Sequence, residues 1–141
     1  MTEWLRRLRR PIGELVQRRA VTGSEAEPLF GLVARMREAG EAAALITDTD
    51  GRAAGVLTAE DLIERALFTL EPDQPVAAVL RRAPALHDQS RIYQALAQMW
   101  RQRRNCLPVA DAMGRPVGLI RFEALLDFRW PAWATRFRRT K

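Results

Sequence analysis

The chain has 141 residues and a formal net charge of +6, with 23 Lys and Arg against 17 Asp and Glu, and 48% of its residues are hydrophobic. This length and apolar content predict one ordinary domain or two very small ones, and they exclude a disordered basic tail. No apolar run is long enough for a transmembrane helix, and we expect no secretory signal at the N-terminus. The single cysteine, Cys106, excludes an internal disulfide and a cysteine-based zinc site, so we expect a cytoplasmic protein without a bound metal.

The basic charge is concentrated at the two ends of the chain. Residues 1–10 carry a net charge of +3 and residues 129–141 carry +5, whereas residues 11–128 carry −2. Both basic tails interleave aromatic residues with arginine, a mixture that suits a nucleic acid, an acidic membrane surface or an acidic protein. The same mixture suits aromatic packing on the body or across a dimer interface, and we favour packing over nucleic-acid binding.

The first half of the central segment, residues 11–128, predicts a long helix followed by two strands and a second helix. Ser24 and Glu27 have the spacing of a capping box, which predicts that a helix opens there and ends near Gly40. Short apolar runs at 42–47 and 53–57 predict two strands, followed by a helix over 59–68. The helix's apolar positions are Leu29, Leu32, Val33 and Met36, and the turn between the strands is Asp48-Thr49-Asp50-Gly51, in which glycine supplies a positive φ.

The second half predicts the same elements after a linker at 71–75. A helix capped at Asp88 ends near Arg103, and strands follow at 106–110 and 116–120 before a last helix at 122–127. The apolar positions of the longer helix are Ile92, Ala95, Leu96 and Met99, and the turn is Asp111-Ala112-Met113-Gly114. With a further short strand ahead of the longer helix, each half has the order strand, helix, strand, strand, helix.

A shift of 63 positions aligns the two halves without a gap. Over residues 16–62, 12 of 47 positions are identical to the residue 63 positions later, where unrelated sequences would share roughly one in fifteen. The chain is therefore a tandem duplication. The repeated residues are Val16, Arg18, Arg19, Ala20, Ala34, Met36, Asp48, Gly51, Arg52, Gly55, Glu60 and Leu62.

Both halves resemble the cystathionine-β-synthase (CBS) domain over their strand–turn–strand–helix segments, at 44–62 and 106–120. Typical of that family are Leu107-Pro108-Val109 before Asp111-Ala112-Met113-Gly114, and a glycine followed by two apolar residues. The resemblance implies a Bateman module with an α/β fold of the α+β type, in which two tandem β-α-β-β-α repeats pack around a pseudo-twofold axis. It places the first repeat at 11–70 and the second at 71–128.

The resemblance also implies an adenosine-containing ligand, such as AMP, ATP or S-adenosylmethionine, in the cleft between the repeats. The first repeat has the family's ligand signature complete, as Gly55-Val56-Leu57-Thr58-Ala59-Glu60-Asp61. A hydroxyl at a helix N-terminus suits a phosphate, and a carboxylate one turn later suits a ribose. The implied ligand-binding residues are Val56, Thr58 and Asp61, with Ala83, Pro84 and Ala85 at the adenine and Arg104 and Asn105 near the phosphates.

The second repeat departs from that signature. Arg121 stands where threonine is expected, and Ala124 stands where the acidic residue is expected. The implied second site, facing Ala20-Val21-Thr22, therefore lacks a ribose acceptor, and Arg121 either meets a phosphate or fills the cleft. We expect at most one competent site per chain.

Each candidate ligand-binding or reactive residue also has a simpler structural interpretation. Thr58 and Asp61 also fit an ordinary helix cap, and Cys106 in an apolar strand fits a small buried side chain. The arginines near the end of the longer helix of the second repeat suit the helix dipole as well as a polyphosphate. No set of nucleophile, base and acid is visible, so we expect no enzyme activity and no catalytic residues.

Together these observations predict a stand-alone regulatory CBS pair that signals to an unidentified partner protein, with no obligatory cofactor, and that forms a homodimer as such modules commonly do. The alternative is an adaptor for proteins or nucleic acids in which the tails bind and the repeats are a ligand-free scaffold.

Overall fold

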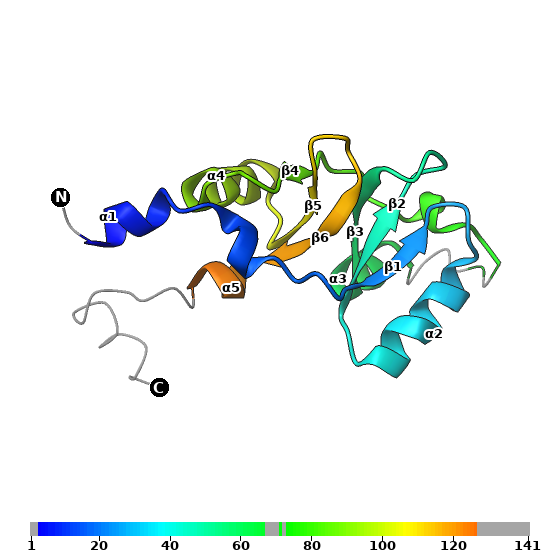
Figure 1. The fold of residues 1–141 in the computed structure, drawn as a ribbon. Helices are drawn as coiled ribbons and strands as arrows, with labels where there is room; N and C mark the ends of the chain where they lie inside the picture. Colours follow the sequence, from blue (N-terminus) through cyan, green and yellow to red (C-terminus); the bar gives the residue numbers. More distant parts are fainter. Residues whose placement is uncertain (1–2, 67–70, 72, 127–141) are drawn as a thin grey trace, which may run out of the picture.

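The computed structural model describes residues 3–66, 71 and 73–126, and Figure 1 shows two similar units side by side. The first unit contains β1 (Val21–Ser24), α2 (Leu29–Ala39), β2 (Ala43–Thr47), β3 (Ala53–Thr58) and α3 (Ala59–Ala66). The second contains β4 (Leu86–His87), α4 (Ile92–Gln102), β5 (Cys106–Ala110), β6 (Pro116–Arg121) and α5 (Phe122–Leu126). Ahead of the units lie α1 (Glu3–Leu8) with the short 3-10 helix η1 (Ile12–Leu15), and η2 (Val76–Ala78), respectively.

Each unit contains one three-stranded sheet with the same topology. β1 is parallel to β2 and β2 is antiparallel to β3, and the order β4-β5-β6 repeats this arrangement. The register repeats at the expected shift of 63, since Ala43 pairs with Thr58 and Cys106 pairs with Arg121. The expected mixed α/β fold of two β-α-β-β-α repeats is confirmed.

The hairpin turns have the predicted chemistry. Gly51 and Gly114 have φ values of 79° and 80°, which side-chain-bearing residues rarely adopt. In the first turn the Asp48 carboxylate accepts hydrogen bonds from the backbone N–H groups of Asp50 and Arg52, at 2.9 and 3.0 Å. Asp111 does the same in the second turn.

The predicted starts of the two long helices are wrong, whereas their ends are confirmed. Ser24 ends β1, and Glu27 accepts its N–H at 2.8 Å within a turn, so α2 begins only after Pro28. Proline disfavours a helical conformation at the residue before it, which moves the start past Glu27. In the second unit Arg91, not Asp88, is the N-cap. The helices end at Gly40 and Arg103, both left-handed, with φ of 68° and 54°.

The segment leading into each unit packs in the core of the other. Ile12 and Val16 are buried in the cluster of the second unit, and Val76 and Leu80 are buried in that of the first. Backbone hydrogen bonds fix both crossings, from Ile12 N–H to Ser90 and from Val76 N–H to Glu27, at 2.8 and 3.0 Å. The two repeats therefore hold each other through an exchange of their lead-in segments.

The lead-in segments are equivalent at a shift of 64, not 63. Val76 is buried in the first unit as Ile12 is buried in the second. A Cβ added to Gly55 would meet the carbonyl oxygen of Arg81, and a Cβ added to the equivalent Gly118 would meet the carbonyl oxygen of Gln17. The residues that the gap-free alignment pairs over Val16–Ala20 and 79–83 are therefore not equivalent in space, because each is one residue away from its structural counterpart. The extra residue lies between Gln17 and β1, because the sheets themselves keep the shift of 63.

A third, smaller cluster joins the two units. It contains Ala43, Val56, Cys106 and Leu119, which form two pairs of equivalent positions. This cluster places the pseudo-twofold axis between the sheets, next to the ends of β3 and β6. None of the helices among the described residues is long and apolar enough to cross a membrane.

Candidate functional site

The central feature of the junction between the repeats is a buried ion pair. Arg104, just before β5, donates to both carboxylate oxygens of Asp61 on α3, with Nη1 to Oδ1 at 2.6 Å and Nη2 to Oδ2 at 3.1 Å. Nη2 also donates to the carbonyl oxygen of Val56 at 2.8 Å. The side chains of Asp61 and Arg104 are 5% and 9% exposed. Three of the predicted ligand residues thus bind one another across the two repeats.

The local turn between β3 and α3 holds the carboxylate in place. The Thr58 N–H donates to Asp61 Oδ2 at 3.0 Å, and the Asp61 N–H donates to the Thr58 hydroxyl at 3.2 Å. This is a reciprocal capping box, so the cap that the sequence offered as an alternative is present. Because Asp61 also binds Arg104, its carboxylate serves the helix and the junction at once.

The ionisation of the pair follows from its surroundings. Burial alone would raise the pKa of Asp61, but the hydrogen bonds from the Arg104 guanidinium and the Thr58 backbone outweigh it and hold this pKa below its ordinary value. The Asp61 carboxylate in turn raises the pKa of Arg104. Both groups therefore carry full charge at neutral pH.

The predicted adenine-binding segment lies beside the same strand. The Ala83 N–H donates to the carbonyl oxygen of Ala54 on β3 at 3.3 Å, and the chain then continues through Pro84 and Ala85 into β4. The side chain of Pro84 is exposed. This segment therefore approaches the strand that ends at Thr58.

A second ion pair occupies the equivalent place on the other side of the axis. Arg121 donates from Nη2 to the Glu41 carboxylate at 2.9 Å and from Nε to the Gln17 side-chain oxygen at 3.0 Å. Glu41 and Arg104 are equivalent positions, so the charge at this position is reversed between the repeats, whereas their partners differ: Arg121 is equivalent to Thr58, and Asp61 is equivalent to Ala124. The predicted role of Arg121 in filling this cleft fits these contacts.

The sequence analysis missed Glu41 and Gln17. Their signal was available in the repeat, because aligning Arg104 with Glu41 shows a reversal of charge at one position. The other residues of the implied second site are spread over several contacts. Ala20 packs against the small central cluster, Val21 packs against the core of the first unit, and the Thr22 hydroxyl donates to the Ala20 carbonyl at 3.3 Å.

A hollow of about 190 Å³ lies on the pseudo-twofold axis between the two ion pairs. Four pairs of equivalent positions and Ala59 line it: Ala42 and Asn105, Ala43 and Cys106, Thr58 and Arg121, and Glu60 and Glu123. It therefore joins predicted residues of both implied sites in one space. Two glutamates and one arginine, which already binds Glu41, give it an acidic balance.

Cys106 borders this hollow as a buried thiol. Burial raises its pKa to about 11, so it is protonated at neutral pH and is a poor nucleophile. Across residues 3–66, 71 and 73–126, no three His, Cys, Asp or Glu side chains come together as a metal site would require.

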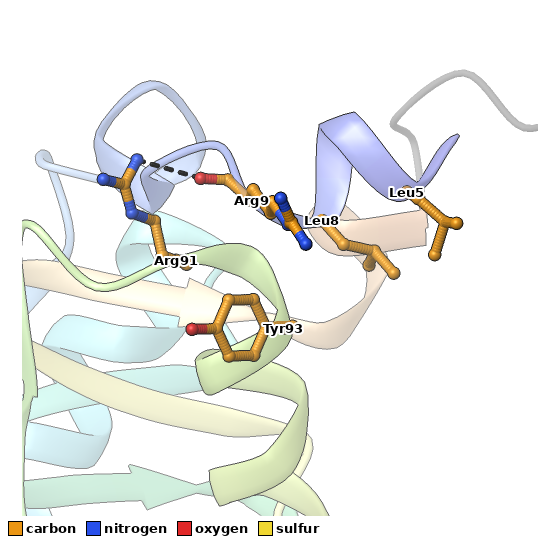
Figure 2. A pocket seen from close by; sticks show the side chains of 5 residues that line it. All are labelled: Leu5, Leu8, Arg9, Arg91 and Tyr93. Carbon is orange, nitrogen blue, oxygen red and sulfur yellow. Dashed lines mark hydrogen bonds between the residues drawn. The ribbon is translucent and has the colours of Figure 1, made fainter. Parts of the chain in front are cut away.

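A larger groove of about 620 Å³ lies away from the junction, between α1 and the start of α4. Figure 2 shows Leu5, Leu8 and Arg9 from the N-terminal segment facing Arg91 and Tyr93 of the second repeat. Arg91 donates to the carbonyl oxygen of Arg9 at 2.9 Å, and Leu8 packs against the core of the second unit. Within the N-terminal basic segment, Leu8 and the backbone of Arg9 thus contact the body. The predicted aromatic packing stays a prediction, because the side chain of Trp4 and residues 129–141 lie outside the described part of the chain.

Residues 12–68 match the family model of the CBS domain. A CBS domain protein from Thermoplasma acidophilum has a similar structure, with a TM-score of 0.76, 22% identity, and coverage of 93% of this chain and 77% of that one. A CBS domain protein from Pyrobaculum aerophilum complexed with AMP has a TM-score of 0.75, 18% identity, and coverage of 91% and 98%.

Among curated proteins, an uncharacterized protein of Methanopyrus kandleri is 24% identical over 119 residues. The match covers 82% of this chain but only 61% of that relative, so the chain spans less than two thirds of the relative's length. The structural similarities lie below 25% identity and bear on the fold.

Proposed function

The chain contains a CBS domain at residues 12–68 and has the fold of a tandem CBS pair, and from this premise we propose that it is a regulatory module that binds AMP between its repeats and passes the bound state to a partner. The observation that carries the proposal is the buried Asp61 carboxylate at the N-terminus of α3, held by Thr58 and faced by Arg104. A ribose needs such an acceptor, and a phosphate needs such a guanidinium.

One feature favours a monophosphate over a triphosphate. Glu60 and Glu123 line the hollow beside Thr58, and their charges repel each additional phosphate of ATP. The structural relative from Pyrobaculum aerophilum is complexed with AMP. We therefore place AMP before ATP, and S-adenosylmethionine is the third ligand to be titrated.

Isothermal titration of the full chain with AMP, ATP and S-adenosylmethionine tests this proposal. We expect AMP to bind and Asp61→Asn to weaken binding by about tenfold or more, because a hydrogen bond to a charged group is lost. Glu64→Gln is the matched control, because Glu64 is an exposed acid on the same helix. Absence of heat with all three ligands contradicts the proposal.

The signalling part of the proposal rests on differential binding. A ligand that contacts both repeats favours one relative arrangement of them, and a partner that reads this arrangement responds to the ligand. Such a role needs no catalytic group, and we propose a regulatory protein, not an enzyme, that meets a cytoplasmic pool of nucleotide.

We further propose a homodimer formed through the helices. Among the described residues, large apolar side chains are exposed on helices α2 to α5, which is the pattern expected of an uncovered interface. Light scattering should give a dimer mass that falls to a monomer mass in Ile63→Glu or Trp100→Glu. These exposed side chains are Phe30 on α2, Ile63 on α3, Tyr93 and Trp100 on α4, and Phe122 on α5.

The adaptor function remains a second candidate because of the groove between α1 and α4. Its apolar walls and two arginines, Arg9 and Arg91, suit an acidic partner segment with apolar anchors. Capture of a partner that is lost in Arg9→Glu but retained in Asp61→Asn would favour this function over nucleotide sensing. Binding of RNA or DNA that weakens with salt would indicate the nucleic-acid version.

A further inference from the structure

The Arg104–Asp61 pair has a consequence for which ligands the site accepts. Both carboxylate oxygens of Asp61 are already occupied, one at 2.6 Å and the other at 3.1 Å from the guanidinium. Oδ2 also accepts the Thr58 N–H. The Asp61 side chain is also only 5% exposed, so ribose hydroxyls cannot reach this carboxylate unless the guanidinium of Arg104 moves away from it.

If Arg104 moves away from Asp61, its guanidinium charge needs another partner. Its side chain is 9% exposed, so water does not readily replace the carboxylate as its partner. The backbone carbonyl of Val56 accepts one of its N–H groups but carries no charge. Glu60, on α3 with Asp61, is a further acid whose charge acts on Arg104, but it raises the pKa of Arg104 less than Asp61 does. Glu123 lies on α5, and Glu41 is engaged with Arg121.

We propose, on the basis of the proposed function, that Arg104 closes the ribose position and opens it only for an adenosine ligand with an anionic group at its 5′ end. The phosphate takes over the guanidinium, and the ribose hydroxyls take over Asp61. One charge-assisted interaction is thus exchanged for two. Plain adenosine offers the hydroxyls but no anion, so it leaves Arg104 unpaired and is rejected.

The discriminating pair of ligands is AMP and adenosine, because they differ only in the phosphate. By calorimetry with the full chain, we expect AMP to bind about tenfold or more tightly than adenosine. In Arg104→Ala the ratio should fall to about threefold or less, with adenosine binding more tightly than to the parent protein. Arg101→Ala, at an exposed arginine in the last turn of α4, should leave the ratio unchanged.

Arg104→Gln provides a second variant that keeps a hydrogen-bond donor for Asp61 but has no charge for a phosphate. Its ratio should fall in the same way even if Arg104→Ala folds poorly. Equal binding of AMP and adenosine to the parent protein, or an unchanged ratio in both Arg104 variants, would overturn this inference and leave the proposed function standing. Failure of every variant and of the parent to bind either ligand would reject the proposed function itself.

Discussion

The two ion pairs that join the repeats share one equivalent position, Glu41 in the first repeat and Arg104 in the second, and differ in their burial. Asp61 and Arg104 are almost fully buried, whereas Glu41 and Arg121 are each 30% exposed. The first pair is bidentate and belongs to a helix cap, and the second shares its arginine with Gln17. A duplicated position has therefore become a closed, charged site on one side of the axis and a partly solvated contact on the other.

The reversal of charge also explains how the repeats recognise each other. The first repeat supplies both acids, Glu41 and Asp61, and the second supplies both arginines, Arg104 and Arg121. Two first repeats would place Glu41 near Asp61, and two second repeats would place Arg104 near Arg121. Like charges at a half-buried contact are unfavourable, so this pattern favours pairing of unlike repeats.

The largest expected effect comes from breaking the buried pair. Arg104→Ala leaves the Asp61 carboxylate buried without its cation, and we expect a loss of about 3 kcal/mol in the free energy of unfolding. Urea unfolding followed by circular dichroism measures it. The double variant Asp61→Asn/Arg104→Gln carries no buried charge and should lose less than Arg104→Ala. A larger loss in the double variant would contradict this account.

The stability lost in Arg104→Ala should depend on pH, because it depends on the charge of Asp61. The pKa of Asp61 lies below its ordinary value, so its contribution is complete above about pH 4 and is lost as the pH falls through the lowered pKa. In Arg104→Ala the buried carboxylate lacks its cation, which raises the pKa of Asp61, so the variant takes up a proton at a higher pH than the parent protein. The stability difference between the two proteins should therefore be larger at about pH 7 than at about pH 3. A difference that does not change with pH would contradict it.

The next largest loss of stability is expected where the lead-in segment of one repeat passes close to a strand of the other. A Cβ on Gly118 would overlap the carbonyl oxygen of Gln17, whereas a Cβ on Gly55 would lie 3.0 Å from the carbonyl oxygen of Arg81. We expect Gly118→Ala to cost about 2 kcal/mol and Gly55→Ala about 1 kcal/mol, because backbone must move in both cases. Thermal unfolding of the two variants compares the crossings, and equal losses would contradict the difference in spacing.

The cap at Thr58 is expected to contribute about as much as other helix caps. Thr58→Ala removes the hydroxyl that accepts the Asp61 N–H, and we expect a loss of about 1 kcal/mol. Thr58→Ser keeps the hydroxyl and serves as the control in the same urea titration. A loss of the same size in both variants would show that the methyl group, not the hydrogen bond, matters.

The smallest effect is expected at the exposed pair. Glu41→Ala should cost less than about 1 kcal/mol, because water and Gln17 can replace the lost contact with Arg121. The loss should fall further as salt is added. If Glu41→Ala proves as costly as Arg104→Ala, the two junctions do not differ as their burial indicates.

Local patterns in the sequence were sufficient to predict most helices and strands and their duplication. Apolar periodicity located the helices and strands, and the glycines at 51 and 114 located the turns, because each depends on neighbours close in the chain. The start of α2 was misplaced because a serine and a glutamate three residues apart also stabilise an isolated turn, and Pro28 excludes the helix from that turn.

The way in which the two repeats are joined became visible only in the folded chain. The exchange of lead-in segments, their shift by one residue and the pairing of Arg104 with Asp61 depend on residues more than 40 positions apart. Local propensity carries no information about such distant partners, whereas burial of a carboxylate forces a choice of cation. The composition gave a strongly basic chain of +6, but the fold placed its most consequential arginine against an acid between the repeats.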